Sequence, residues 1–278
     1  MRDNEMQVTI NTKDLQQVNS INIGLHDGRI TVGFGEDAAT SAKSVLGAGY
    51  IAPMVLPMKT LDHLSWADVD RISKLPNVRE YFALGARKKD YMKNGFVAEW
   101  QIIGFDHDDL ADGSGKACLS WDMVRVYKER IQMNSDWDNE GGWESCKANK
   151  YAHEEFLPQC SDELQAIILP VIKLTSEGGG STEIIKSVCK VWLKSEKELF
   201  GRCIWSAPGE GRWYEYYMQE DVPYYKEDDE GSRRWNWLRS PDASDSTNFC
   251  LVNIGGASTS SGATIGYCVS FGFCSGRR

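Results

Sequence analysis

The sequence lacks several features on which common function classes depend. No apolar run approaches the roughly 18–20 residues needed to cross a bilayer, and the N-terminus lacks the basic and then apolar profile of a secretion signal. The only histidines are His26, His63, His107 and His153, and none lies beside a nucleophile motif such as GxSxG. We therefore expect a protein that is made in the cytoplasm, has no membrane span and has no catalytic residues.

Metal-binding and cofactor-binding motifs are also missing. The eight cysteines form no CxxC pair and have no histidines at zinc-finger spacing, so buried free thiols are expected. The glycine-rich segments GFGEDA and GEG are not followed by a P-loop lysine, and GGG at 178–180 is typical of a loop tip. No metal site and no cofactor are predicted.

Nucleic acid is excluded as a partner by charge. The formal net charge is −9, and the basic residues are scattered rather than gathered in one stripe. A hydrophobic content of 41% in 278 residues supports a packed core.

Short strand-like runs dominate the chain and predict an α+β fold. INIGL and RITVGFG precede a proline-bounded segment, which indicates a small attachment or assembly region over residues 1–55 and a larger domain over 56–278. Helices are predicted after the N-cap residues Ser65 and Ser161, and after GGW at 141. Strands are predicted in REYFALG, VAEWQIIGF, IIKSVCKVWLKS, RCIWS, RWYEYYM and RRWNWLRSP.

Three stretches carry candidate chemistry. FDHDDLADGSGK gathers four carboxylates within seven residues, which suits a hard cation, although the loop also fits a solvated, self-capping turn. The aromatic residues of RWYEYYMQEDVPYYK suit stacking on sugars or, more simply, core packing. Arg239 in WLRSP is either catalytic or, more commonly for arginine, a donor that anchors loop carbonyls.

Five residue types that are common in the rest of the chain are missing together from its C-terminal part. Lys, Glu, Gln, Met and Trp make up 62 of the 278 residues, yet none occurs at the 35 positions from Asp242 to Gly276. These five are the residues that an AAC or AAT codon randomised at its adenines cannot encode. An ordinary β-meander of small residues would also avoid Lys and Glu at buried positions, but this does not explain their absence from exposed turns.

An ordered series of motifs carries a family resemblance over about residues 57–278. FDHDDLADGSGKACLSW, YKERIQMN with GGW, SDELQAIILPVIK, LKSEKELFG and WNWLRSP with NFCLVN and VSFGFC resemble the variable proteins of diversity-generating retroelements from gut bacteria and their phages. The resemblance implies a C-type lectin-like domain with short strands, a few helices and long loops. It implies a variable region over about 235–274, rewritten by adenine-directed mutagenesis to display different ligand-binding side chains.

The resemblance also implies particular residues and partners. The buried scaffold is expected at Phe249, Cys250, Val252, Phe271 and Phe273, and Cys268 stands where the pattern usually has Gly. The ligand is an unknown protein or glycan, reached from a phage tail or a bacterial cell surface, and residues 1–55 are expected to support a homo-oligomer. The positions expected to contact ligand are Asp242, Asp245, Thr247, Asn248, Leu251, Ile254, Gly255, Ala257, Thr259, Ser260, Ser261, Gly262, Thr264, Ile265 and Tyr267, together with Trp235 and Asn236.

Large side chains usually supply binding hot spots, so the anchors among these positions are expected to be Ile254, Ile265, Tyr267, Trp235 and Asn236.

Two other functions stay open on the same broad fold. A formylglycine-generating type of enzyme is disfavoured because no RGGSW-like motif appears. A calcium-dependent sugar lectin is disfavoured because no EPN, QPD or WND ligand motif appears.

Overall fold

The chain divides into two compact units, Met1–Leu56 and Pro57–Arg278. The computed structural model describes residues 21–26, 29–34 and 57–277. In the first unit, strands β1 (Ile21–His26) and β2 (Arg29–Phe34) form an antiparallel hairpin, as their β-branched sequences predict. The rest of the expected attachment region lies outside the described residues, and its role stays a prediction.

The second unit is mixed α+β, with mostly strands and a few short helices, which confirms the predicted fold class at that level. Its main sheet has six strands in the order β3-β4-β5-β6-β15-β9, in which only β3 and β4 pair in parallel. These strands are β3 (Met58–Thr60), β4 (Phe82–Tyr91), β5 (Val97–Phe105), β6 (Leu119–Met123), β9 (Val191–Trp192) and β15 (Gly272–Ser275).

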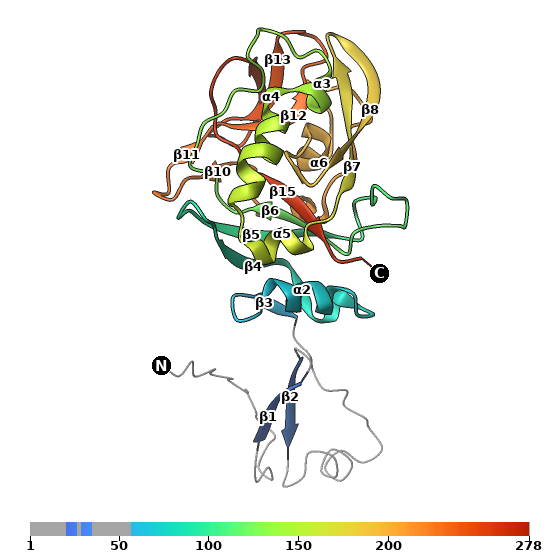
Figure 1. Ribbon diagram of the computed structural model, residues 1–278, viewed down its shortest axis with the longest axis vertical. Coiled ribbons are helices and arrows are strands. Elements are labelled where there is room, and N and C mark those ends of the chain that lie inside the picture. Colours follow the sequence, from blue (N-terminus) through green and yellow to red (C-terminus); the bar gives the residue numbers. More distant parts are fainter. Residues whose placement is uncertain (1–20, 27–28, 35–56, 278) are drawn as a thin grey trace. The chain divides into compact units, whose positions relative to one another are not determined.

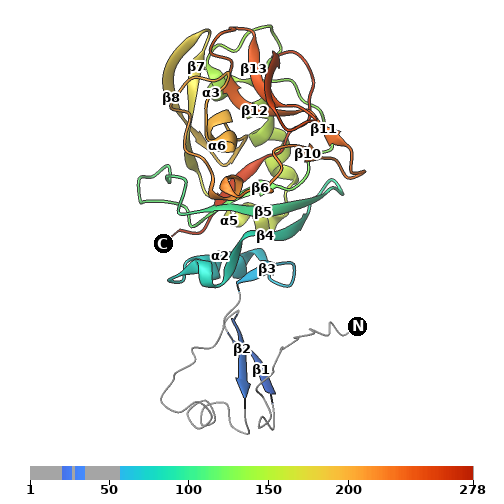
Figure 2. The same cartoon turned by 180° about the vertical axis from the view of Figure 1, so that it is seen from behind.

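A three-stranded sheet and two hairpins complete the strand structure. Strand β7 lies beside β12, and the long β7–β8 hairpin runs along the flank of the small sheet in both views (Figures 1 and 2). The small sheet has the order β12-β13-β14. The strands are β7 (Val171–Gly178), β8 (Ser181–Cys189), β10 (Lys226–Glu227), β11 (Arg233–Arg234), β12 (Asn236–Pro241), β13 (Asn248–Val252) and β14 (Ser258–Gly262).

Five short α-helices lie between these strands. They are α2 (Trp66–Ser73), α3 (Gly142–Ser145), α4 (Lys147–Tyr151), α5 (Asp162–Ile167) and α6 (Glu196–Phe200). The predicted N-caps are confirmed: Ser65 Oγ accepts from the Asp68 N–H at 3.0 Å, and Ser161 Oγ accepts from the Leu164 N–H at 3.2 Å. Among the described residues, no helix is both long and apolar enough to cross a membrane.

Aromatic packing joins the end of the chain to the middle of the main sheet. Strand β15 pairs with β6 on one side and β9 on the other. Its Phe273 stacks on Trp121 at 5.7 Å between ring centroids and meets Trp100 edge-on at 4.8 Å. Residues near the C-terminus are therefore part of the core rather than a tail.

Two predicted strands are absent from the described chain. RWYEYYM contains a 3-10 helix over Glu215–Met218 with Tyr214 as its N-cap residue. The three-residue spacing of Tyr214 and Tyr217 turns both rings into the core. RCIWS is a loop, because the backbone N–H groups of residues 204–206 donate to the carboxylate of Glu196 instead of to a neighbouring strand.

Candidate ligand-binding surface

The small sheet β12-β13-β14 positions the segment that the sequence singled out. Strand β13 is its central strand, and Phe249, Cys250, Leu251 and Val252 are fully buried, so this strand is packed on both faces. The predicted burial of Phe249, Cys250, Val252, Phe271 and Phe273 is confirmed. Strand β14 lies at the edge of the sheet and carries only Ser, Thr and Gly.

Most of the predicted contact positions reach solvent on β14 and the turns around it. Ile254 is 50% exposed, and Ile265 and Trp235 are each 38% exposed. The partly or largely exposed positions are Asp245, Thr247, Asn248, Ile254, Gly255, Ala257, Thr259, Ser260, Ser261, Thr264, Ile265, Tyr267 and Trp235. We refer to these residues as the display surface.

Four predicted contact positions are buried, and the expectation that they touch ligand is corrected. Leu251 lies on the central strand, and Gly262 lies under the ring of Trp137. Asp242 is 2% exposed, and its carboxylate accepts from the N–H and hydroxyl of Ser244 within a turn. These side chains serve the fold.

Asn236, predicted to be an anchor, is the fourth. It is 1% exposed at the start of β12, and its side-chain oxygen has no hydrogen-bond partner. Next to it, Trp235 stacks on Tyr267 with ring centroids 5.8 Å apart, and Trp237 meets Tyr267 edge-on at 5.1 Å. The aromatic part of the display surface thus rests on a buried tryptophan.

Two exposed tryptophans border β14 and were missed by the sequence reasoning. Trp137 is 60% exposed and lies against Gly262, where an added Cβ would come within 2.0 Å of its ring. Trp205 is 42% exposed, and its indole N–H donates to the carbonyl of Ser258 at 3.4 Å. The only available signal was the presence of Trp in the polar segments SDWDN and RCIWSAPGEG, which are unusual surroundings for a core residue.

Side chains outside the display surface hold its backbone. Buried Asn139 donates to the carbonyls of Asp245 at 2.9 Å and Asn248 at 2.6 Å, and its side-chain oxygen accepts from the Gly179 N–H at 2.7 Å. At the β13–β14 turn, the side-chain oxygen of Asn253 accepts from two backbone N–H groups, those of Gly255 and Ala257. Both turns are therefore shaped by side chains that are not part of the display surface.

Glu196 fixes the other side of β14. One of its carboxylate oxygens accepts from the N–H groups of Ile204, Trp205 and Ser206 at 2.7–2.9 Å, and the other accepts from the hydroxyl of Ser258. This fully buried carboxylate thus ties the loop that bears Trp205 to the first residue of β14.

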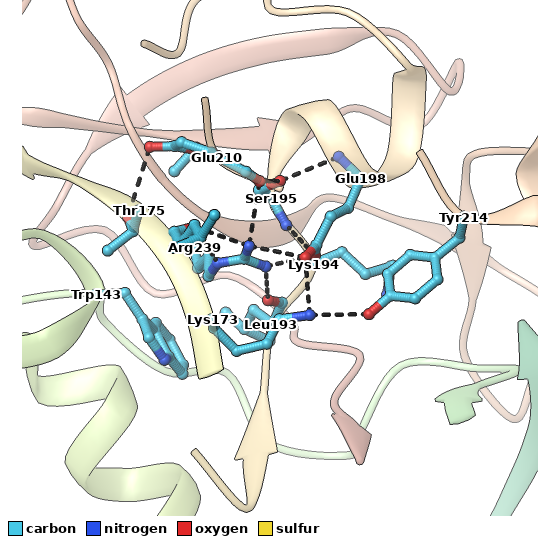
Figure 3. A network of polar contacts seen from close by, with 12 residues as sticks. Trp143, Lys173, Thr175, Leu193, Lys194, Ser195, Glu198, Glu210, Tyr214 and Arg239 are labelled. Carbon is cyan, nitrogen blue, oxygen red and sulfur yellow. Dashed lines mark hydrogen bonds and ion pairs between the residues drawn. The ribbon is translucent and has the colours of Figure 1, made fainter. Parts of the chain in front are cut away.

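A buried network of charged side chains lies beneath the sheet and centres on Arg239 of β12 (Figure 3). Its guanidinium forms a bidentate ion pair with Glu198 and donates to the carbonyls of Leu174 at 2.9 Å and Leu193 at 2.9 Å. The anchoring interpretation of Arg239 is thereby supported over a catalytic one, because no reacting group has access to a side chain that is 0% exposed.

The network takes up one carboxylate of the acidic loop. Lys173 donates to Asp108 at 2.7 Å, to Glu198 at 2.7 Å and to Tyr214 at 2.8 Å. Burial alone would raise the pKa of Asp108, but Lys173 holds it below its ordinary value. Asp109 pairs instead with Lys116, and no group of three or more potential metal ligands occurs among the described residues.

Glu210 is the least stabilised anion in this network. Its carboxylate accepts from the Ser176 N–H at 2.8 Å and from the hydroxyl of Ser240, and it is fully buried. Burial raises the pKa of Glu210 to about 7, and these hydrogen bonds offset only part of that effect.

The eight cysteines are free thiols and all but Cys203 are buried, as expected.

Comparison with known proteins gives one match. A family profile described as a domain of unknown function, DUF6273, matches residues 114–270, which is more than half of the chain. The matched range includes the display surface and the Arg239 network except Asp108. No curated protein and no solved structure matches the chain.

Proposed function

The chain belongs to the DUF6273 family, and we propose that it is a ligand-binding display protein whose C-terminal variable region is diversified by a retroelement. On this proposal the second unit is a C-type lectin-like domain, and its ligand is a protein or glycan on a cell surface. The partners, the phage-tail or cell-surface location and any homo-oligomer belong to the same proposal, which assigns no catalytic role to the chain.

One observation carries the proposal. The positions that the family resemblance marks as mutable are mostly solvent-facing, while the intervening positions Phe249, Cys250 and Val252 are fully buried. A surface that must accept many side chains needs its rigidity from elsewhere, and here Asn139, Asn253 and Glu196 supply it.

The retroelement part is tested in the DNA around the gene. We expect a near-identical template repeat beside a reverse transcriptase gene, with adenines at the codons of the display-surface residues between Asp245 and Tyr267. Isolates should differ at those codons and hardly at all in residues 57–234. Substitutions spread evenly over both regions, with no such repeat, would exclude diversification.

The binding part is tested by randomising the display surface of the full chain with AAC-derived codons and selecting on hen lysozyme as an arbitrary folded target. We expect folded binders to emerge, and double substitution of Ile265 and Tyr267 by Ala to weaken the binders that retain both residues. A matched library that randomises Asp242, Leu251, Gly262 and Asn236 should yield mostly unfolded protein. Equal yields of binders from both libraries would contradict the proposed surface.

A further inference from the structure

Strand β14 presents an unpaired backbone edge. In an antiparallel ladder, successive residues direct their N–H and C=O groups alternately toward the partner strand and away from it. Asn253 donates to the carbonyl of Ala257, and Ala263 donates to that of Thr247, so the odd-numbered residues face β13. Ser258, Ser260 and Gly262 therefore direct their backbone groups to the outer edge.

The middle of this edge is free. Within the described part of the chain, neither the N–H nor the C=O of Ser260 has a hydrogen-bond partner, and no strand lies beyond β14 in its sheet. At the two ends, the Ser258 carbonyl accepts from Trp205 and the Gly262 carbonyl accepts from the Ile265 N–H at 3.0 Å. Exposed edges of this kind accept an additional strand.

The tryptophans define the length of segment that fits. Trp205 contacts the first residue of β14 and Trp137 contacts the last. At a rise of roughly 3.4 Å per residue these positions are about 14 Å apart, which corresponds to four or five residues of extended peptide. The indole rings are 42% and 60% exposed, so each has apolar surface available to a bound side chain.

Charge distinguishes the two ends of the edge. Next to Trp137 in the sequence, Asp136 and Asp138 both line an open hollow of about 740 Å³. Its charged lining consists of five carboxylates and two lysines, namely Asp136, Asp138, Glu140, Glu154, Glu155, Lys147 and Lys150. A basic side chain is therefore favoured at this end of a bound segment.

We propose that the β14 edge, flanked by Trp205 and Trp137, binds an extended peptide of the ligand protein as a fourth strand, with a Lys or Arg directed to the acidic hollow. This inference rests on the proposed display function and specifies its partner as a protein with an exposed extended segment. Backbone hydrogen bonds at Ser260 supply affinity that is independent of the variable side chains, which then discriminate between ligands.

The test uses a phage library of random linear 12-residue peptides selected on the full-length protein. We expect enriched peptides with alternating apolar residues and a basic residue near one end. A synthetic enriched peptide should bind wild type and Ser260→Ala within about twofold, because the alanine keeps the backbone groups. Ser260→Pro should bind at least tenfold more weakly, because it removes the edge N–H but no bond to β13.

Thermal unfolding verifies that Ser260→Pro folds, and a peptide series gives a second measurement on wild type. N-methylation of the peptide at alternate residues should abolish binding, and N-methylation at the residues between them should preserve it. The proposal is overturned if no peptide is enriched, if Ser260→Pro and the N-methylated peptides bind normally, or if sedimentation reveals a dimer that Ser260→Pro dissociates. If the edge site fails these tests but the display library still yields lysozyme binders, only the edge site is refuted. If the library also yields no binders, the proposed function is refuted as well.

Discussion

The buried network centred on Arg239 of β12 and the display surface on and around β14 share one small sheet and follow opposite rules. In the network each charged group has specific partners: Arg239 bonds Glu198 and backbone carbonyls, and Lys173 bonds two carboxylates and a phenol. On the display surface, side chains such as those of Ile254 and Thr259 end in solvent or at its border. The sheet separates the residues that determine the fold from those free to determine binding.

The first way to break this contrast is to remove the centre of the network with Arg239→Met. The substitution takes the bidentate partner from Glu198, which keeps Lys173, and leaves the carbonyls of Leu174 and Leu193 without the arginine donor in a dry interior. We expect a loss of about 3–5 kcal/mol in unfolding free energy, measured by urea denaturation.

The control is Arg79→Met, which removes another bidentate arginine–glutamate pair, with Glu215, whose two side chains are 54% and 41% exposed. Exposed pairs contribute little, so a loss within about 1 kcal/mol is expected. Equal losses from the two substitutions would mean that the interior position of Arg239 is unimportant.

Asn139→Ala tests whether the backbone of the display surface is held by a residue beneath it. The alanine removes the side-chain donor from the carbonyls of Asp245 and Asn248, each of which keeps one backbone donor, and it leaves the N–H of Gly179 without a partner. We expect a loss of about 2–3 kcal/mol in unfolding free energy and loss of ligand binding. Asn248→Ala is the control for stability, since that side chain bonds only Asp245 and Thr247. A similar loss of unfolding free energy there would contradict the separation.

The sequence allowed much of the local structure to be predicted, because it depends on neighbouring residues. The caps Ser65 and Ser161, strand β5 and the burial of Phe271 and Phe273 follow from spacing and side-chain type. Most of the positions that the resemblance marks as variable are exposed.

The network and the tryptophan borders were not predictable in the same way. Lys173 meets Asp108 across 65 positions of sequence, and Arg239 meets Glu198 across 41, so no local pattern connects them. Leu251 was predicted to be a variable contact position, but it is buried because β13 is the central strand of its sheet. Composition does not specify the order of the strands. The segment around Trp205 was predicted as a strand. Its backbone N–H instead donates to the carboxylate of Glu196, which is nine residues away and which no local pattern indicates.

Glu210→Gln sharpens the contrast through pH. The pKa of Glu210 is raised from 4.5 to about 7, so the folded state favours the protonated form. The stabilisation that this shift gives the folded state is fully present below pH 4.5 and is lost as pH rises through 7, by an amount on the order of 3 kcal/mol. Gln keeps an acceptor for Ser176 but does not titrate. The unfolding free energy of wild type should therefore fall relative to that of Glu210→Gln between pH 5 and 8, and parallel curves would refute the shift.

The smallest effects are expected on the display surface itself. Ile254→Ala and Thr259→Ala remove side chains that lie in or near solvent, and the bonds that shape their turn come from Asn253 and are untouched. Each should change the unfolding free energy by no more than about 0.5 kcal/mol, measured by the same urea titration. Leu251→Ala on the adjacent strand should lower the unfolding free energy by about 2–5 kcal/mol, because it opens a cavity in the core. Should Thr259→Ala prove as costly as Leu251→Ala, β14 would be part of the folding core, and a strand that the fold requires cannot be rewritten freely for binding.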